Sequence, residues 1–251
     1  MSKKVYDSLF SPFKIADVEI KNRFVMCAMG GMLLYKHDGS IPQEAIDFYI
    51  ERAKNGVGLI VTRAVIVKPI GLEFNLYDKP VIFEPLRELT ASVHKYGCKI
   101  FMQLSAGAGR IIHQTVKQME DKGIAFEDAF VAPSDNIPNV WYPEIKHRGL
   151  TRNEINEYVI TFGKMARIAK DIGFDGVELH AVHEGYLMDQ FTISCMNKRT
   201  DDYGGNIENR FRFPCEIIKE IKKTCGDRYP VAVRYSVTSK MISYGRGDRK
   251  S

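Results

Sequence analysis

The sequence predicts an α/β fold in which parallel strands alternate with helices. Short runs rich in β-branched and other apolar residues alternate along the chain with segments whose apolar residues recur at helical spacing. Glycine and other turn residues separate the two kinds of segment. This alternation is typical of βαβ units and a parallel sheet. Five strands are expected, whereas a closed (β/α)8 barrel needs eight. The pattern by itself therefore allows either an open five-stranded sheet or a barrel truncated after about five βα units.

The composition fits a folded domain. The chain has 251 residues, of which 45% are hydrophobic and 27% charged, which suits one barrel-sized domain, or one large or two small domains of another kind. The formal net charge is +5, and the basic residues are dispersed apart from the tail at 246–250. We therefore expect no nucleic-acid partner. A mildly basic surface suits a phosphate-bearing cofactor or an acidic substrate, and equally an ordinary solvated surface.

The cysteines and the N-terminus point to a reducing compartment. The five cysteines form no C-x-x-C pair, which argues against a disulfide framework and a zinc ribbon. The first ten residues, MSKKVYDSLF, contain basic residues without a following apolar segment, so no signal peptide is expected. No apolar run is long enough to cross a bilayer. We expect a cytoplasmic protein without a membrane partner.

The first part of the chain predicts a hairpin and then two βα units. Residues 5–22 form a lead-in hairpin with its turn at Ala16-Asp17. RFVMCAM at 23–29 is a buried strand that ends at Gly30. The pattern Ser40-x-x-Gln43 predicts a capping box for a helix through Asn55. The segments that follow are a strand at 58–67, a helix around Leu86, Leu89 and Val93 that is closed by Gly97, and a strand at 99–105.

A long irregular stretch from Ala106 to about Leu150 interrupts the alternation. It contains three prolines and the only tryptophan, Trp141. Loops of this length inside a compact domain are usually lids or binding loops. The alternative is a disordered insertion, against which its aromatic and apolar content argues.

The regular pattern resumes after this stretch. Thr151-x-x-Glu154 predicts a capping box, and apolar residues at helical spacing carry the helix to Gly173. The segments after it are a strand at 176–182, a helix at 209–225 and a strand at 230–236.

Candidate functional residues follow from one rule of parallel sheets, that active groups lie at the carboxyl ends of the strands. The rule selects residues at the ends of apolar strands, and all of them except Met29 are polar or unusually small. They are Met29, Gly30, Ala64, Gln103, His180, His183 and Arg234. Two histidines that donate to one carbonyl oxygen would polarise it. Tyr186, just behind them, could then deliver a proton to a neighbouring carbon as a general acid.

Gln103 and Arg234 suit a cofactor more than a substrate. An amide both donates and accepts, which fits the polar edge of a flat heterocycle. A guanidinium places a fixed positive charge beside a group that becomes anionic, and a reduced flavin is one such group.

Structural alternatives remain open for each of these residues. A histidine pair could bind a metal, but HAVHE lacks the H-E-x-x-H order and a third ligand, so no metal is expected. Either histidine could donate to backbone, and Tyr186 could simply pack. Arg234 could be a buried ion-pair partner, and Gln103 could satisfy backbone groups.

An ordered set of motifs makes the chain resemble a known family. It resembles the Old Yellow Enzyme and 2,4-dienoyl-CoA reductase group of NADH:flavin oxidoreductases. The matching segments are LFSPFKI at 9–15, KNRFVMCAM at 21–29, YIERAKNGVGLIVTRA at 49–64, QLSAGAGR at 103–110, APSD at 132–135, GFDGVELHAVHEGYLMDQF at 173–191, NKRTDDYGG at 197–205, NRFRF at 209–213 and PVAVRYS at 230–236.

The resemblance implies a (β/α)8 TIM-barrel fold with FMN at its top, and a single FMN-binding domain over residues 1–251 from which strands six to eight are absent. It implies hydride transfer from reduced FMN to the activated C=C bond of an enone, an enoyl thioester or a ketosteroid, with NAD(P)H reducing the flavin. The implied roles are flavin contacts for Ala28, Met29, Gly30, Ala64, Gln103 and Arg234, substrate-carbonyl binding for His180 and His183, and proton donation for Tyr186. The variant HAVHEGYL, one residue longer than the commoner HxxHGYL, resembles bacterial proteins of anaerobic gut species.

The chain also departs from the family pattern. Cys27-Ala28-Met29 replaces A-P-M, and the second strand ends in TRA rather than TE. The iron–sulfur cysteine cluster and the FAD and NAD(P)H domain of longer relatives have no counterpart here. A five-strand piece exposes an apolar edge, so we expect low stability as a monomer, or dependence on a second copy or a complementing chain. The competing hypothesis is a catalytically silent fragment.

Overall fold

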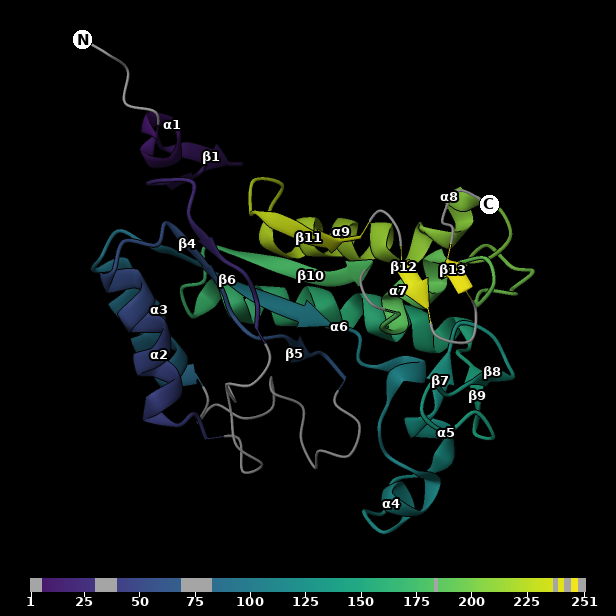
Figure 1. Cartoon of the computed structure of the whole chain (residues 1–251). Coiled ribbons are helices and arrows are strands. Elements are labelled where there is room, and N and C mark those ends of the chain that lie inside the picture. The colour runs from purple at the N-terminus through teal and green to yellow at the C-terminus, as the bar shows by residue number, and fades with distance from the viewer. Residues whose placement is uncertain are drawn as a thin grey trace.

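The structure is a computed structural model that describes residues 6–29, 40–68, 83–182, 185–236, 239–241 and 245–247. Its centre is one parallel sheet (Figure 1) with the strand order β11-β10-β6-β4-β3. This order follows the order of these five strands along the chain, and each neighbouring pair is parallel. The α/β prediction is therefore confirmed. The strands are β3 Val25–Met26, β4 Leu59–Val61, β6 Lys99–Ser105, β10 Gly176–Val182 and β11 Val231–Tyr235, with β5 Val65–Ile66 pairing β6 beyond the end of β4.

The outer face of the sheet is covered by helices. Side chains alternate across a strand, and those on this face form the main hydrophobic core, which includes Ile60, Ile100, Met102, Val177 and Leu179. Two helices, α2 and α3, cover the β4 side, and α6 and α9 cover the β10 side (Figure 1). These helices are α2 Gln43–Lys54, α3 Phe83–His94, α6 Arg152–Asp171 and α9 Arg212–Cys225.

The inner face carries a second, smaller apolar cluster. Ile20, Leu59, Val61 and Phe101 are buried there, and Ala232 packs against them. Ile20 comes from the N-terminal hairpin, β1 Phe13–Ile15 and β2 Val18–Ile20, which pair antiparallel. The turn residue Ala16 has φ +50°. The predicted lead-in hairpin and its turn are confirmed, and the hairpin closes the inner face over the amino-terminal part of the strands.

The sheet is strongly curled. In a flat sheet with strands about 4.8 Å apart, β3 and β11 would be separated by roughly 19 Å. Ala28, which follows β3, and Arg234, on β11, nevertheless line one cavity of about 440 Å³. Ala232 on β11 likewise packs against the cluster that holds Leu59 of β4. The sheet therefore bends round on itself as part of a barrel does, which confirms the barrel-type fold.

Helix α2 begins differently from the prediction. It starts at Gln43, and Pro42 is the N-cap residue without a side-chain cap hydrogen bond. The capping box predicted at Ser40 is therefore wrong, since a proline with fixed φ starts the helix in place of a side-chain acceptor. The capping box of α6 is confirmed, because the Thr151 side chain accepts from Glu154 N and the Glu154 carboxylate accepts from Thr151 N.

The strand predicted at 58–67 is interrupted. Residues 62–64 belong to neither β4 nor β5, although Thr62 N still donates to the Phe101 carbonyl of β6 at 3.0 Å. There the backbone N–H of Arg63 donates to the Tyr49 hydroxyl of α2 at 3.0 Å, instead of to a neighbouring strand. The strand predicted at 23–29 is likewise shorter, and only Val25 and Met26 pair in the ladder. The prediction that it is buried is wrong, because it is an outermost strand and Val25 is 44% exposed.

The stretch 106–150 is more regular than predicted. Its short elements are the 3-10 helix η3 Gly109–Ile111, the helices α4 Val116–Glu120 and α5 Phe126–Ala129, and the strands β7 Val131–Ala132, β8 Ile137–Pro138 and β9 Lys146–Gly149. Its own core holds Ile112, Met119, Ala129 and Phe130. A buried cluster of this kind contradicts the alternative of a disordered insertion.

Two smaller differences and the remaining elements complete the description. The helix predicted at 209–225 is two helices, α8 Ile207–Arg210 and α9, separated by Phe211. An unpredicted helix, α7 Leu187–Thr192, follows β10. The remaining elements are α1 Asp7–Phe10, β12 Ser239–Met241 and β13 Gly245–Gly247. Within the described ranges, no helix combines the length and the apolar character needed to span a membrane.

The outermost strands of the sheet expose apolar side chains, as the sequence predicted. Val25 on β3 is 44% exposed, and Val233 and Tyr235 on β11 are 40% and 51% exposed.

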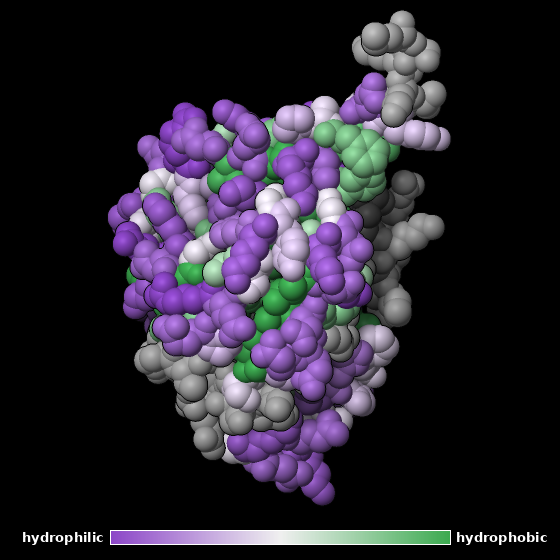
Figure 2. All heavy atoms as spheres, turned by 90° about the vertical axis from the view of Figure 1, so that its left-hand side faces the viewer, coloured by the Kyte–Doolittle hydropathy of each residue, from purple (hydrophilic) through white to green (hydrophobic). Residues whose placement is uncertain are grey.

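Figure 2 views the molecule from the side of α2 and α3. This side is mostly hydrophilic, with narrow hydrophobic areas between the polar side chains.

Gly176 is required where β10 passes Phe101. A Cβ built on Gly176 would lie 2.7 Å from two ring carbons of Phe101 and 2.8 Å from Cβ of Pro230. We predict that Gly176→Ala lowers the free energy of unfolding by about 1–3 kcal/mol through overpacking, measured by urea denaturation. The double variant Gly176→Ala/Phe101→Leu should destabilise less than the sum of its two single changes. Strict additivity would contradict this steric account.

Candidate active site

A cavity of about 440 Å³ opens at the carboxyl ends of the parallel strands. Seven of the nine predicted site residues line it, namely Ala28, Met29, Ala64, Gln103, His180, Tyr186 and Arg234. The other two, Gly30 and His183, lie outside the described residues. The remaining lining residues, which the sequence analysis did not select, are Arg63, Ile66, Ser105, Gly107 and Ala108.

Strand register places the polar residues in two layers. Gln103 lies opposite Glu178, and Glu178 lies opposite Ala232 on the other side. One layer higher, His180 lies opposite both Ser105 and Arg234. Because residues two apart on a strand share a face, both layers belong to the inner face that holds Phe101 below them. The cavity therefore begins where the apolar filling of the curled sheet ends.

Gln103 is held by an interstrand hydrogen bond. Its side chain is buried, with 4% exposure. Its Nε2 donates to Oε1 of Glu178 at 2.6 Å, a length typical of a bond to a charged acceptor. Gln103 thus reaches the cavity in a fixed position.

His180 and Tyr186 meet at one point of the cavity. Their ring centroids are 4.3 Å apart with an interplanar angle of 57°. His180 is 8% exposed, and Tyr186 is the N-cap residue of α7. An imidazole and a phenol at this separation can address adjacent atoms of one small molecule.

The turn that carries Tyr186 is tied down on both sides. The N–H of Gly185 donates to the Asp189 carboxylate at 2.7 Å, and Gln190 Nε2 donates to the Gly185 carbonyl at 2.7 Å. Leu187 N donates to the Gly107 carbonyl at 3.1 Å, which joins the turn to the stretch after β6. Asp189 and Gln190 are fully buried. These hydrogen bonds fix the backbone on both sides of Tyr186 and thereby position its phenol ring.

Arg63 is the main residue that the sequence reasoning missed. It directly precedes Ala64, and its half-buried side chain adds a second guanidinium to the cavity besides Arg234. A signal was present, since Arg63 interrupts the apolar run of 58–67 and belongs to the TRA departure from the family pattern. The predicted strand at 58–67 runs through Arg63, whereas β4 ends at Val61.

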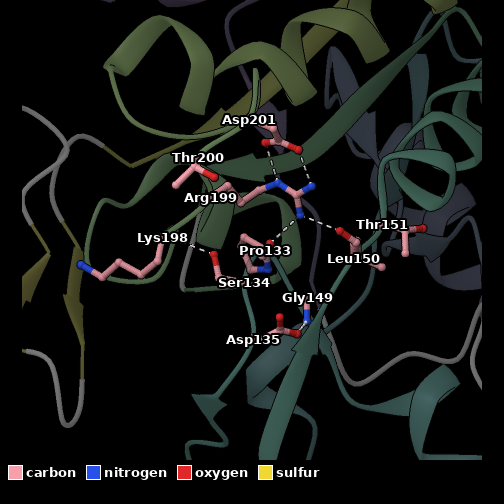
Figure 3. A pocket seen from close by; sticks show the side chains of 10 residues that line it. All are labelled: Pro133, Ser134, Asp135, Gly149, Leu150, Thr151, Lys198, Arg199, Thr200 and Asp201. Carbon is pink, nitrogen blue, oxygen red and sulfur yellow. Dashed lines mark hydrogen bonds and ion pairs between the residues drawn. The ribbon is translucent and has the colours of Figure 1, made fainter.

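A second hollow, of about 510 Å³, lies away from these residues between the loops 133–135, 149–151 and 198–201 (Figure 3). Arg199 spans it and donates to both carboxylate oxygens of Asp201, at 2.9 and 2.6 Å. It also donates to the carbonyls of Pro133 and Leu150. Because protein acceptors take these donors, Arg199 joins three segments together and the hollow is a structural junction.

His147 lies in the core of the stretch 106–150. Its Nδ1 is 3.1 Å from the Val131 carbonyl, which can only accept, so Nδ1 carries the proton. Its Nε2 then accepts from Nδ2 of Asn139 at 3.3 Å. Burial lowers the pKa of His147 to about 4, and the positive charge of Arg110 acts in the same direction. His147 is therefore neutral at pH 7.

Metal ligation finds no support in the described part of the chain. No group of three or more histidine, cysteine, aspartate or glutamate side chains is placed there to hold a metal ion.

A curled parallel sheet with a polar cavity at the carboxyl ends of its strands defines the class as an α/β-barrel type of enzyme domain. Comparison with protein families makes this specific. Residues 8–246 match the model of the NADH:flavin oxidoreductase / NADH oxidase family. The chain belongs to this family.

Curated relatives agree with this assignment. The chain is 46% identical to cinnamate reductase of Clostridium sporogenes, over 98% of this chain and 36% of the relative. It is 40% identical to NADH oxidase of Thermoanaerobacter brockii, over 92% of this chain and 34% of the relative. The chain therefore spans about a third of the length of these relatives.

Solved structures agree as well. Old Yellow Enzyme from Pichia sp. AKU4542 superimposes with a TM-score of 0.78 at 30% identity, over 92% of this chain and 60% of that one. A 2-naphthoyl-CoA reductase complex gives a TM-score of 0.77 at 29% identity, over 92% of this chain and 35% of that one.

Protonation of His147 makes the fold sensitive to acid. The unfolded chain binds a proton near pH 6.5 and the folded chain near pH 4, so the unfolded state holds more protons between these values. The contribution of neutral His147 to the free energy of unfolding is fully present above pH 6.5 and decreases as the pH falls towards 4. We predict a loss of about 2 kcal/mol between pH 7 and pH 5 that His147→Gln abolishes, measured by urea denaturation at each pH.

The matched control for this experiment is His113→Gln. His113 is exposed and stacks on Trp141, so its replacement should leave the acid loss in place. An equal acid loss in wild type and His147→Gln would exclude His147 as its source.

Proposed function

We propose that the chain is the FMN-binding barrel portion of an NAD(P)H-dependent oxidoreductase that reduces a C=C bond conjugated to a carbonyl group. The observation that carries this proposal is the convergence of Gln103, Arg234, His180 and Tyr186 on one cavity. FMN, once reduced by NAD(P)H, supplies the hydride for such a reaction.

The cavity is suited to a flat ring. Its volume of about 440 Å³ falls in the range of roughly 300–1,000 Å³ that is usual for small-molecule sites. Ala28, Ala64, Gly107 and Ala108 leave space along the wall, and Met29 adds an apolar surface. Polar groups are few and placed at separate points, which favours a heterocycle with one apolar face and one polar edge.

Arg234 and Gln103 would hold the polar edge of the flavin. A guanidinium remains charged at any working pH and stabilises negative charge that develops beside it. Gln103 provides neutral hydrogen bonding from the neighbouring layer of the cavity.

His180 and Tyr186 would act on the substrate. In our proposal His180, together with His183, donates hydrogen bonds to the substrate carbonyl oxygen and polarises the conjugated alkene. Tyr186 gives its phenolic proton to the carbon next to the carbonyl, as a general acid. The 4.3 Å between the His180 and Tyr186 ring centroids suits groups that serve neighbouring atoms.

The names of the relatives support a conjugated acyl compound as substrate. One is a cinnamate reductase and another a 2-naphthoyl-CoA reductase. Both names describe aromatic molecules with a carboxyl or thioester group. For this chain we propose an enone, an enoyl thioester or an unsaturated acid, with the carbonyl at His180.

Flavin binding is the first test. Titration of the purified chain with FMN should quench flavin fluorescence and shift the visible absorption bands, because Gln103, Arg234 and the small wall residues form a pocket for the ring. Arg234→Ala should weaken the binding by roughly tenfold or more, since a charge-assisted contact contributes about 1.5–3 kcal/mol. Absence of binding by wild type would favour the competing hypothesis of a fragment that is silent by itself.

The proton-donor role is tested in the FMN-loaded protein by separating the half-reactions. Tyr186→Phe should slow alkene reduction by 10²- to 10⁴-fold, the usual contribution of a general acid, and leave flavin reduction by NAD(P)H largely unchanged. Stopped-flow absorbance of the flavin measures each step. Tyr96→Phe is the control, because Tyr96 is exposed and is not among the residues that line the cavity. Equal slowing of both half-reactions by Tyr186→Phe would contradict the role.

A further inference from the structure

The carboxylate of Glu178 determines which end of the Gln103 amide enters the cavity. A carboxylate can only accept hydrogen bonds. The group that approaches Glu178 Oε1 at 2.6 Å must therefore be the NH₂ of Gln103 and not its carbonyl oxygen. The two ends of a glutamine amide have almost the same shape, so without such a partner either orientation fits.

The carbonyl oxygen of Gln103 is left for a ligand. The side chain is buried, with 4% exposure, and lines the cavity. Among the described residues, no donor bonds to this oxygen, and the backbone N–H of Gln103 is used by Thr62 Oγ1 at 3.4 Å. Because Gln103 lines the cavity, this oxygen can accept from a bound molecule or from water.

The surroundings of Glu178 fit this arrangement. It lies on β10 between Gln103 of β6 and Ala232 of β11. Ala232 packs against the inner apolar cluster that contains Phe101, so this cluster lies next to Glu178. Glu178 does not line the cavity described above. Its hydrogen bond with Gln103 connects it to a residue that does.

We propose that Glu178 is a positioning residue that fixes the Gln103 carbonyl oxygen towards the cavity, and so makes this point of the site specific for an N–H donor on the cofactor ring. The inference rests on the proposed function, in which that ring is the isoalloxazine of FMN. The imide N–H of the isoalloxazine, between its two carbonyls, is the donor that the oxygen would accept. Glu178 thereby selects the orientation of the ring edge without touching it.

The orientation of Gln103 is tested in the chain without flavin. The side-chain NH₂ signals of Gln103 in a ¹⁵N-labelled sample are assigned by their loss in Gln103→Leu. A charge-assisted bond should shift one of the two protons downfield and slow its exchange with water. Glu178→Leu should remove both effects, and Glu178→Gln should reduce them. Signals that are unchanged in Glu178→Leu would overturn the proposal.

The effect on the cofactor is tested with a flavin whose imide N–H is blocked. Wild type should bind FMN about tenfold more tightly than 3-methyl-FMN, the expected value of one hydrogen bond. Glu178→Gln keeps the size of the side chain but allows both amide orientations, so this preference should fall severalfold. A merely structural role of Glu178 would weaken both flavins equally and leave the ratio unchanged, which would overturn the proposal.

The matched control is Glu88→Gln, which neutralises an exposed glutamate on α3 and should leave the ratio and the NMR signals as in wild type. Failure of the two ideas is distinguishable. If wild type binds neither flavin, the proposed function fails, and the NMR comparison alone decides whether Glu178 orients Gln103. If wild type binds FMN and Glu178→Gln leaves the ratio unchanged, the proposed function stands and the positioning role fails.

Discussion

The packing of Phe101 inside the curled sheet is the contact on which the rest of the structure depends. Its ring fills the inner face together with Leu59, Val61 and Ile20 of the N-terminal hairpin, and Gly176 on the next strand has no side chain to compete for that space. A curled sheet encloses a volume that must be filled by apolar side chains at one end if the other end is to stay open. The floor of the cavity therefore lies where these apolar side chains end.

The polar layers above this floor follow from strand register rather than from local sequence. Gln103 is two residues beyond Phe101 on β6, and parallel pairing brings Glu178 beside it. The same pairing brings His180 beside Arg234 on β11. Segments that are far apart in the chain thus supply neighbouring groups. Gln103, Glu178 and His180 are held by β6 and β10, which are buried against the helix layer, whereas Arg234 lies on the outermost strand β11. Rigid elements of this kind position functional groups more accurately than loops do.

The sequence predicted the strands and their polar ends well because both depend on local pattern. His180, Gln103 and Arg234 each follow an apolar run, and the rule about carboxyl ends applies to any parallel sheet. Ala64 was also selected by this rule, as an unusually small residue at a strand end, whereas Ala28 came from the family resemblance alone. Features that depend on tertiary contacts were missed. Strands of two residues in 106–150 are too short for a periodic pattern, and Pro42 starts α2 where Ser40 offered a plausible cap.

The hydrogen bond between the Tyr49 hydroxyl and the backbone of Arg63 couples a surface helix to the cavity wall. This bond replaces a hydrogen bond to a neighbouring strand. The backbone path of residues 62–64 therefore depends partly on Tyr49 of α2 and not only on the strand itself. Helix α2 and the segment after β4 therefore have to be exchanged together between related proteins. A chimaera that borrowed α2 from a relative lacking this hydroxyl would leave the Arg63 amide in need of another acceptor, and the wall would be rebuilt although no residue lining the cavity had been exchanged.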